Sequence, residues 1–557
     1  MLNNEDPLDS TALNSSTASF SITKLALAAP RHSGESVHHP AVGHLPKLWQ
    51  SNLQCRAVSN SVEIGAHSLA TLRAVARKEL VRLAHHYSNQ YGDFAKPANS
   101  DQVLLAGHQP ELFHPGVWYK NFLLSRWGKQ FDCAAINLVV DNDLGQNPAI
   151  QVPHQPAPTK TTGSNAALAQ VPFDSPGFNL PFEERPIVDP NLFQSFGTRA
   201  KIVIAPLVND PIVNQLWPQV LSAAKTISQD GQTNLGQAIA AGRHRLEAQA
   251  NLQTLEIPLS QIANTESFAN FVGQIIADLP RFHEIYNRCL AEYRTVYGLR
   301  SRAHPVPALA RADDWIEIPF WIWQTRQPAR KRVFVRQLGP SFFLSDRLGW
   351  QMEFSNQSAI GALSELSSQG IKLRPRALMT TMYSRLVLSD LFIHGIGGGQ
   401  YDQLTDMISA RFWGHPLPAF WAVSATMKLP TGATDDSPSD IAAIRHRLRE
   451  LKYHPERFIS ADQSGWMSNT ISKKHNWIRH RIEGTLVERH RAIAECNTEL
   501  QPLVAAQRIR WERELSRLTS QVYENSILGS REFSFCLFSS DLVDDLRKMA
   551  ASSREFS

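Results

Sequence analysis

One stretch of the chain, from Gln102 to Asp143, restricts the possible folds more than any other. Residues Val103 to Ala106 form an apolar run that stops at Gly107, which is the pattern of a short buried strand. After a polar loop, Pro115 occupies the first-turn position that proline favours in helices. A second apolar run, Cys133 to Val140, then leads into acidic residues. These features predict a β-α-β unit, and with it an α/β fold built on a parallel sheet.

The unusual polar residues of this unit fall in its two turns, where the strands would end. In open parallel sheets, ligands bind outside the carboxyl ends of the strands. His108 and His114, six residues apart across the first turn, resemble the paired histidines that meet ATP phosphates in nucleotidyltransferases. Asp141 and Asp143 follow the second strand and could accept a proton from an amine or hold Mg²⁺. These four are the candidate catalytic residues. The alternatives are histidines that only make structural hydrogen bonds and aspartates that only cap a turn.

Further candidates for substrate or nucleotide binding come from this unit and from three later segments. Glu317 lies in an aromatic strand pattern, where burial against Trp and Phe would raise its pKa, unless it faces water on an edge strand. Arg374 is a candidate clamp for a carboxylate or phosphate. A glycine-rich turn that opens a helix, at residues 395–399, would present backbone N–H groups to an anion, or only change the chain direction. The remaining candidates are Gln109, Lys120, Asn121, Asn142, Tyr383, His394, Gly397, Gly398, Gly399 and Gln400.

The length of 557 residues exceeds one hydrophobic core, so two or three domains are expected. We expect a flexible tail over residues 1–60 and an α/β core over 61–430. That core contains a short strand at Lys201–Ala205 and a helical insertion at about 210–300. Residues 144–198, which show no clear helix, would be a substrate-facing loop or a simple insertion. Apolar residues at a spacing near 3.5 predict a helical coiled-coil domain over 431–557, which packs on the core or forms a homodimer.

Composition excludes several classes of protein. Hydrophobic residues make up 43% and charged residues 19%, which indicates a globular protein, and no apolar run reaches the length of a membrane span. Fifteen Lys and Arg against nine Asp and Glu between Ile441 and Arg517 leave an excess of six. Such runs are usually the solvated faces of long helices, so nucleic acid is not an expected partner. Five scattered cysteines without zinc-type spacing, and no signal peptide pattern, favour a cytoplasmic protein with reduced thiols, and no metal-ligating residues are assigned.

Two separated segments resemble one family. GHQPELFHPGVWYKN at 107–121 resembles the segment that leads into a helix in the bacillithiol biosynthesis cysteine-adding enzymes. Asp141-Asn142-Asp143 stands where that family has an acidic and histidine-containing cluster. Arg374-Pro375, the 386–391 segment and the glycine turn look like its later motifs, in the same order. The sequence departs from the family at His108, where a Gln is expected, and it has no Glu after the glycine turn.

The resemblance implies a Rossmann-like core of the nucleotidyltransferase type, a helical insertion and a C-terminal coiled coil. It implies a ligase that joins the carboxyl group of an amino acid, cysteine in the family, to the amine of glucosaminyl-malate. The expected partners are small-molecule substrates, and the expected cofactors are ATP and Mg²⁺. Two alternatives stay open, namely a transferase of other substrate on the same fold, and a non-catalytic scaffold with a degenerate core.

Overall fold

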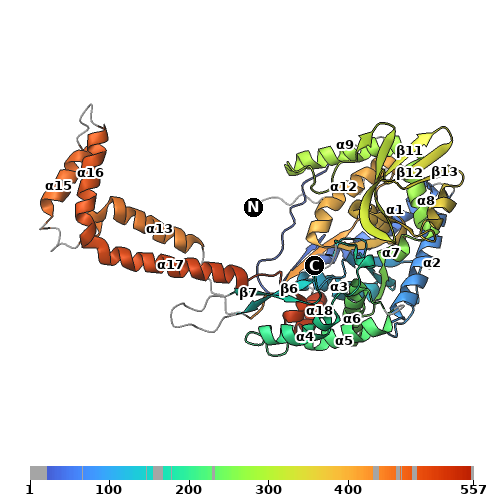
Figure 1. The fold of residues 1–557 in the computed structure, drawn as a ribbon, viewed down its shortest axis with the longest axis horizontal. Helices are drawn as coiled ribbons and strands as arrows, with labels where there is room; N and C mark the ends of the chain where they lie inside the picture. Colours follow the sequence, from blue (N-terminus) through green and yellow to red (C-terminus); the bar gives the residue numbers. More distant parts are fainter. Residues whose placement is uncertain are drawn as a thin grey trace.

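The protein is a mixed α/β molecule with a helical arm that projects from its body (Figure 1). The structure, a computed structural model, describes residues 22–64, 67–145, 147–154, 167–176, 179–228, 232–430, 438–459, 465, 467–479 and 486–552. In this part of the chain, no helix combines the length and the apolar composition that crossing a bilayer requires.

A six-stranded sheet carries the β-α-β unit expected at 102–143. Its strands lie in the order β1 (Glu35–His39), β16 (Trp421–Thr426), β15 (Leu391–His394), β4 (Val103–His108), β5 (Ala134–Val139) and β8 (Leu255–Pro258). All neighbouring pairs are parallel except β1 with β16. The chain therefore builds outward from β4 to β5 and β8, and then returns to the other side of β4 with β15 and β16. The direction of winding reverses between β4 and β15.

Alternation along the strands divides the interior into two cores. Leu104 and Ala106 of β4 point into one core, and Val103 and Leu105 point into the other. The first core is filled by α1 (Leu45–Val58), α3 (Pro115–Gln130), α4 (Pro190–Ile204), α5 (Val213–Thr226), α6 (Leu235–Gln249) and α18 (Leu542–Ser552). The second is filled by α2 (Leu69–Ser88), α7 (Leu259–Ile262), α8 (Glu266–Ala277), α9 (Leu279–Tyr297), α11 (Ala377–Tyr383) and α12 (Ile396–Trp413). Helices on both faces explain why the parallel strands are apolar throughout.

A second, antiparallel sheet adds to the second core. It runs in the order β13 (Gln351–Ser355), β12 (Ser341–Ser345), β11 (Gln327–Leu338), β10 (Trp315–Gln324) and β14 (Ile371–Pro375), with β9 (Arg311–Ala312) paired to β10. The strand pattern expected around Glu317 is confirmed as β10. Helix α10 (Ala359–Glu365) links β13 to β14. Two further small sheets pair β2 (Glu63–Ile64) with β3 (His67–Ser68), and β6 (Ala149–His154) with β7 (Ala167–Pro172).

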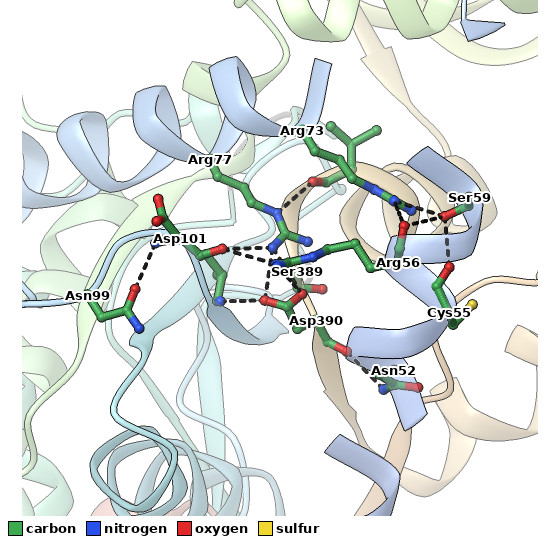
Figure 2. A network of polar contacts seen from close by, with 12 residues as sticks. Asn52, Cys55, Arg56, Ser59, Arg73, Arg77, Asn99, Asp101, Ser389 and Asp390 are labelled. Atoms are coloured by element: carbon green, nitrogen blue, oxygen red, sulfur yellow. Dashed lines mark hydrogen bonds and ion pairs between the residues drawn. The ribbon is translucent and has the colours of Figure 1, made fainter. Parts of the chain in front are cut away.

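Asp390, the residue before β15, ties the amino ends of the central strands to α1 and α2. Its carboxylate accepts hydrogen bonds from Nη1 of Arg56, from Nη1 of Arg77 and from the backbone N–H of Val103, each at 2.9 Å. Arg73 lies beside these two arginines and donates to the backbone carbonyls of Leu386 and Arg56 (Figure 2). We call Arg56, Arg73, Arg77 and Asp390 the amino-edge cluster. Together with Val103, it joins α1, α2 and β4 to the start of β15, which lies at least 287 residues further along the chain.

The arm consists of α13 (Pro438–Tyr453), α15 (Ser468–Arg479), α16 (Leu486–Leu500) and α17 (Ala505–Leu528), with α15 packed on α16 and α13 on α17. The helical domain was expected to include the rest of the chain, but the chain returns to the body after α17. Phe535 is fully buried against Trp118, and α18 packs on α3. The arm is therefore an insertion between β16 and α18, both of which belong to the body.

Three other expectations differ from the structure. Residues 35–58, expected in a flexible tail, form β1 and α1, and Trp49 of α1 is buried. The strand expected at Lys201–Ala205 is the end of α4, whose start is marked by Asp189 as N-cap and Pro190 in the first turn. The 210–300 region is not wholly helical, because it supplies β8 to the central sheet.

Candidate functional site

The reversal between β4 and β15 brings two strand ends and two helix starts together. β4 ends at His108 and β15 at His394, and they pair in parallel. Helix α3 follows β4 and begins at Pro115, and α12 follows β15 and begins at Ile396. Neither helix has an acidic residue in its first turn. Because helix N-termini carry partial positive charge, this edge of the sheet favours an anion.

Lys120 is the buried cation of this edge. Only 4% of the residue is exposed, and its Nζ donates to the backbone carbonyl of Gly107 at 2.7 Å. No carboxylate of the described residues forms an ion pair with it. Burial, reinforced by the charge of Arg243, lowers the pKa of Lys120 to about 7. An anion placed against Nζ would stabilise the charged form and raise that pKa.

The two histidines of the first turn lie within the field of Lys120. Burial, and then the charge of Lys120, lowers the pKa of His108 to about 3. Burial lowers the pKa of His114 to about 4, although the exposed carboxylate of Glu532 opposes the shift. His114 is also the N-cap of α3, and its Nδ1 accepts a hydrogen bond from the N–H of Gly116 at 3.1 Å. Both imidazoles are therefore neutral near pH 7, and they offer hydrogen bonds rather than charge.

The glycine segment lies in the first turn of α12. Gly395 is the N-cap residue, with no side-chain cap, and a Cβ atom at Gly395 or Gly397 would meet nothing within 4 Å. Gly398 and Gly399 are closely approached instead, by His394 and by Ala422 respectively. The next candidate, Gln400, turns away and donates to the carbonyl of Leu27 at 3.0 Å. We call His108, His114, Lys120 and His394 the carboxyl-edge cluster, because Lys120 acts electrostatically on all three histidines.

The turn after β5 lies beside this cluster, but its acidic groups are occupied. Asp141 is buried and accepts from the N–H of Ser260 at 2.9 Å and from its hydroxyl at 2.5 Å. Burial raises the pKa of Asp141 to about 7. Asp143 accepts from Nε2 of Gln109 at 3.1 Å and pairs with Arg330 at 3.1 Å.

The buried amide of Asn142 donates to the carbonyl of Pro375 at 2.6 Å. The Asp141–Asp143 turn thus joins β5 to the antiparallel sheet as much as it faces a ligand.

Four candidates lie in structural networks away from the cluster. Arg374 was expected to clamp a ligand, but it is buried and bonds both carboxylate oxygens of Glu183, at 2.8 and 3.0 Å. Tyr383 donates to the hydroxyl of Ser267 at 3.0 Å inside the second core. Asn121 donates to Oε1 of Glu247 at 2.7 Å.

The fourth candidate, Glu317, reverses the expected pKa shift. Burial does favour its neutral form, as its aromatic surroundings suggested. However, Arg332 and the backbone N–H of Ala310 donate to its carboxylate, and Arg376 pairs with it at 2.7 Å. These donors lower the pKa of Glu317 below its ordinary value. The carboxylate is an ion-pair centre of the antiparallel sheet and not a general acid.

Sequence reasoning missed charged residues that surround the cluster. Arg531 and Glu532, which follow the arm, reach Ser424 of β16 and His114 of α3. Nothing in the local sequence shows that this segment returns to the site. Asp402 and Asp406 are different, because two acids four residues apart on one helix face repel each other unless a cation lies between them. Arg385 is that cation, and its guanidinium lies 2.6 Å from the carboxylate of Asp402 and 2.5 Å from that of Asp406.

The described residues do not fit a magnesium site built by the protein. No group of three or more His, Cys, Asp or Glu side chains gathers among them. The oxygens of Asp141 are engaged by Ser260, and those of Asp143 by Arg330 and Gln109. Either aspartate would have to release these partners to coordinate a cation.

Two hollows bear on the choice of site. One of about 460 Å³ lies at the amino ends of the strands, lined by Cys133, Lys129 and Leu255, where burial raises the pKa of the Cys133 thiol to about 12. A smaller hollow, of about 150 Å³, opens beside Pro110 and Glu111 in the loop that follows β4. Only the smaller one adjoins the histidine loop. Comparison with protein-family models and with curated proteins finds no match to this chain.

Proposed function

We propose that this chain is a nucleotide-binding α/β enzyme that activates a carboxylate with ATP and forms an amide bond. The observation that carries the proposal is Lys120, a buried cation of α3 without a carboxylate partner among the described residues, whose Nζ bonds the carbonyl of Gly107 near the end of β4 and whose charge also acts on His394. Burying an unpaired charge is costly, so a chain that retains one at a strand end gains something from it. A phosphate group supplies the missing negative charge.

The order of the parallel strands supports a Rossmann-like core. From β8 through β5 and β4 to β15 and β16, the order by chain position is 3-2-1-4-5. Doubly wound folds of this order bind nucleotides across the strand ends where the winding reverses. The carboxyl-edge cluster lies at that reversal. Neutral His114, whose Nδ1 accepts from Gly116, would donate its Nε2–H to a phosphate oxygen, while Lys120 supplies the charge. The single N–H of neutral His108 is at Nδ1 and bonds the carbonyl of Gln109, so His108 would contribute an acceptor.

The chemistry follows from this arrangement. A carboxylate oxygen of the substrate attacks a phosphorus atom of ATP, and the bond from that phosphorus to its leaving oxygen breaks. The product is an adenylate or an acyl phosphate. An amine nitrogen then attacks the activated carbonyl carbon, loses a proton, and expels the phosphate group with its bonding electron pair. Cations and backbone N–H groups at the cluster stabilise the negative charge that develops on the oxygens in both steps.

The resemblance to cysteine-adding enzymes suggests the substrates. Cysteine would provide the carboxylate, and an amino sugar of the glucosaminyl-malate type would provide the amine. The hollow beside Pro110 and Glu111 is of a size to hold a small amino acid. His108 departs from the family pattern at this loop, so the acceptor is the part of the proposal that most needs a direct measurement.

Nucleotide binding can be tested without knowing the acceptor. In the protein without bound nucleotide, the pKa of Lys120 is about 7. A bound phosphate would raise that pKa, so ATP binding near pH 7.5 should be accompanied by proton uptake. Calorimetry in buffers of different ionisation enthalpy measures this uptake. Lys120→Met should weaken binding by at least about tenfold and abolish the uptake. Lys129→Met, on the exposed end of the same helix, is the matched control and should change neither.

The reaction is tested by incubating the protein with ATP, cysteine and glucosaminyl-malate and analysing the products by mass spectrometry. An amide product together with AMP or ADP supports the proposal. Nucleotide binding without amide formation would instead favour a transferase of other substrate. Absence of nucleotide binding, with a correctly folded protein, would overturn the proposal and favour a scaffold role for the arm.

A further inference from the structure

The end of β15 carries a second arrangement that a phosphate site does not require. His394 is the last residue of β15, and its Nε2 lies 2.9 Å from Oδ2 of Asp402 in α12. Asp402 is fully buried and also accepts from Arg385 at 2.6 Å and from the hydroxyl of Thr381 at 2.6 Å. Because an ionised carboxylate can only accept, the imidazole must donate its Nε2–H to it. The other ring nitrogen, Nδ1, is then left with its lone pair.

Nδ1 of His394 is directed at the glycine turn. A Cβ atom at Gly398 would lie 2.7 Å from Nδ1, so only glycine leaves room there. Among the described residues Nδ1 has no hydrogen-bond partner, and 5% of the side chain remains exposed. The rings of Phe392 and Phe420 pack against the imidazole, with ring centroids 4.5 and 5.1 Å from its own. The lone pair therefore faces the first turn of α12.

The charged groups around His394 carry a net negative charge that one added proton would neutralise. Arg385 bonds two carboxylates, Asp402 at 2.6 Å and Asp406 at 2.5 Å, so the ionised group carries one surplus negative charge. An imidazolium at His394 would neutralise it. Lys120 and Arg385 act against protonation, Asp402 favours it, and burial is the largest influence and lowers the pKa of His394. The histidine is thus neutral at rest and next to a group that stabilises its charged form.

We infer that His394 is the proton acceptor of the carboxyl-edge cluster and that Asp402 is its positioning residue. This inference rests on the proposed function for its substrate, which is the amine that attacks the activated carbonyl. As the carbon–nitrogen bond forms, the amine proton passes to Nδ1 and the phosphate group leaves with its electron pair. Asp402 stabilises the resulting imidazolium through Nε2–H. His394 later returns the proton to solvent, so the charge balance is restored.

The first test needs no substrate. Nitrogen-15 NMR of histidine-labelled protein, assigned by difference from His394→Gln, reports which ring nitrogen carries the proton. We expect the Nε2–H form. Diethyl pyrocarbonate acylates an unprotonated imidazole nitrogen, and mass spectrometry gives the rate at His394. Gly398→Ala should slow this rate by about tenfold or more, because the added methyl group fills the space at Nδ1. Gly397→Ala, where nothing lies within 4 Å, is the matched control and should leave the rate unchanged.

The second test uses the amide-forming reaction. Asp402→Asn should reduce kcat by about 100-fold, the usual scale of a lost proton-transfer contribution. It should also move the acidic limb of the kcat profile to lower pH, because the neutral amide no longer stabilises the imidazolium. A purely structural defect would lower kcat without moving that limb. KM for ATP should stay within about threefold, since Asp402 is fully buried and its carboxylate bonds Thr381, Arg385 and His394.

Two results would overturn the inference. One is an Nδ1–H tautomer, and the other is a modification rate at His394 that Gly398→Ala leaves unchanged. Both are measured on the free protein, so they stay informative if no amide product is ever found. Conversely, an intact His394–Asp402 pair with no nucleotide binding would contradict the proposed function alone.

Discussion

Arg77 and Lys120 are equally buried, each 4% exposed, at opposite edges of the same parallel sheet. Arg77, in the amino-edge cluster, contacts both oxygens of Asp390 and the carbonyls of Val387 and Asp101. Lys120, in the carboxyl-edge cluster, bonds one backbone carbonyl and no carboxylate among the described residues. The first arrangement holds four elements together. The second leaves a buried charge without a carboxylate partner among the described residues, and on that ground we propose that the ligand binds at the carboxyl edge.

The contrast extends to the whole of each cluster. At the amino edge, both carboxylate oxygens of Asp390 accept hydrogen bonds from donors of α1, α2 and β4 (Figure 2). At the carboxyl edge, burial holds the pKa values of His108 and His114 low and keeps both neutral. Buried polar groups that are fully paired stabilise a fold, whereas incompletely paired ones destabilise it until something binds.

The largest expected effect is on stability and comes from the amino edge. Asp390→Ala would leave Arg77 buried without its carboxylate, and it would remove an acceptor from Arg56 and from the N–H of Val103. Loss of one partner of a buried ion pair costs about 3–5 kcal/mol. We expect the free energy of unfolding, measured by chemical denaturation, to fall by that amount.

Asp101→Ala is the matched control for this change. Asp101 lies in the same network, but Arg56 and Arg77 bond its backbone carbonyl, which the substitution keeps. The variant should lose less than about 1 kcal/mol. Equal destabilisation by both substitutions would mean that the Asp390 carboxylate does not hold this edge.

The second expected effect has the opposite sign and depends on pH. The pKa of Lys120 is lowered to about 7 in the folded state from an ordinary value of 10.5, so the folded protein binds fewer protons than the unfolded chain between these pH values. The penalty of the buried charge is fully present below pH 7 and is relieved as pH rises. Lys120→Met should therefore stabilise the protein at pH 6.5, and its advantage should shrink by up to about 1.4 kcal/mol per pH unit above 7.

Denaturation curves of the wild type and Lys120→Met at pH 6.5, 7.5 and 8.5 measure this difference. Lys129→Met should show no such trend, since Lys129 is exposed. If Lys120→Met destabilised the protein equally at every pH, Lys120 would be a structural residue like Arg77. The comparison between the two edges would then fail.

Much of the carboxyl edge could be predicted because its signals are local. Strand β4, the proline start of α3, strand β5 and the glycine start of α12 each follow from a few neighbouring residues. The α/β class and the location of the histidines at a strand end came from that periodicity. Candidate residues inside this unit accordingly lie close together, including His108, His114 and Lys120.

The rest could not be predicted because it depends on pairs that are distant in the sequence. Arg374 has the composition of a ligand clamp, and only its contact with Glu183, 191 residues away, makes it structural. The local sequence places Glu317 in an apolar strand, but Arg332 and Arg376, which donate to its carboxylate, come from other parts of the chain. Asp402 has no local mark that connects it to His394. Buried charges are interpretable only with their partners, and the partners are tertiary.

The smallest expected effect tests where the carboxyl-edge cluster ends. Glu532 is 67% exposed and lies 3.6 Å from His114, at the base of the arm. Its charge opposes an incoming phosphate, but solvent screens it, and the low pKa of His114 leaves little positive charge for it to pair with. Glu532→Gln should therefore tighten ATP binding by no more than about threefold in calorimetry, and salt should erase the gain. A much larger gain would mean that the segment returning from the arm guards the site, and the boundary of the cluster would then have to include it.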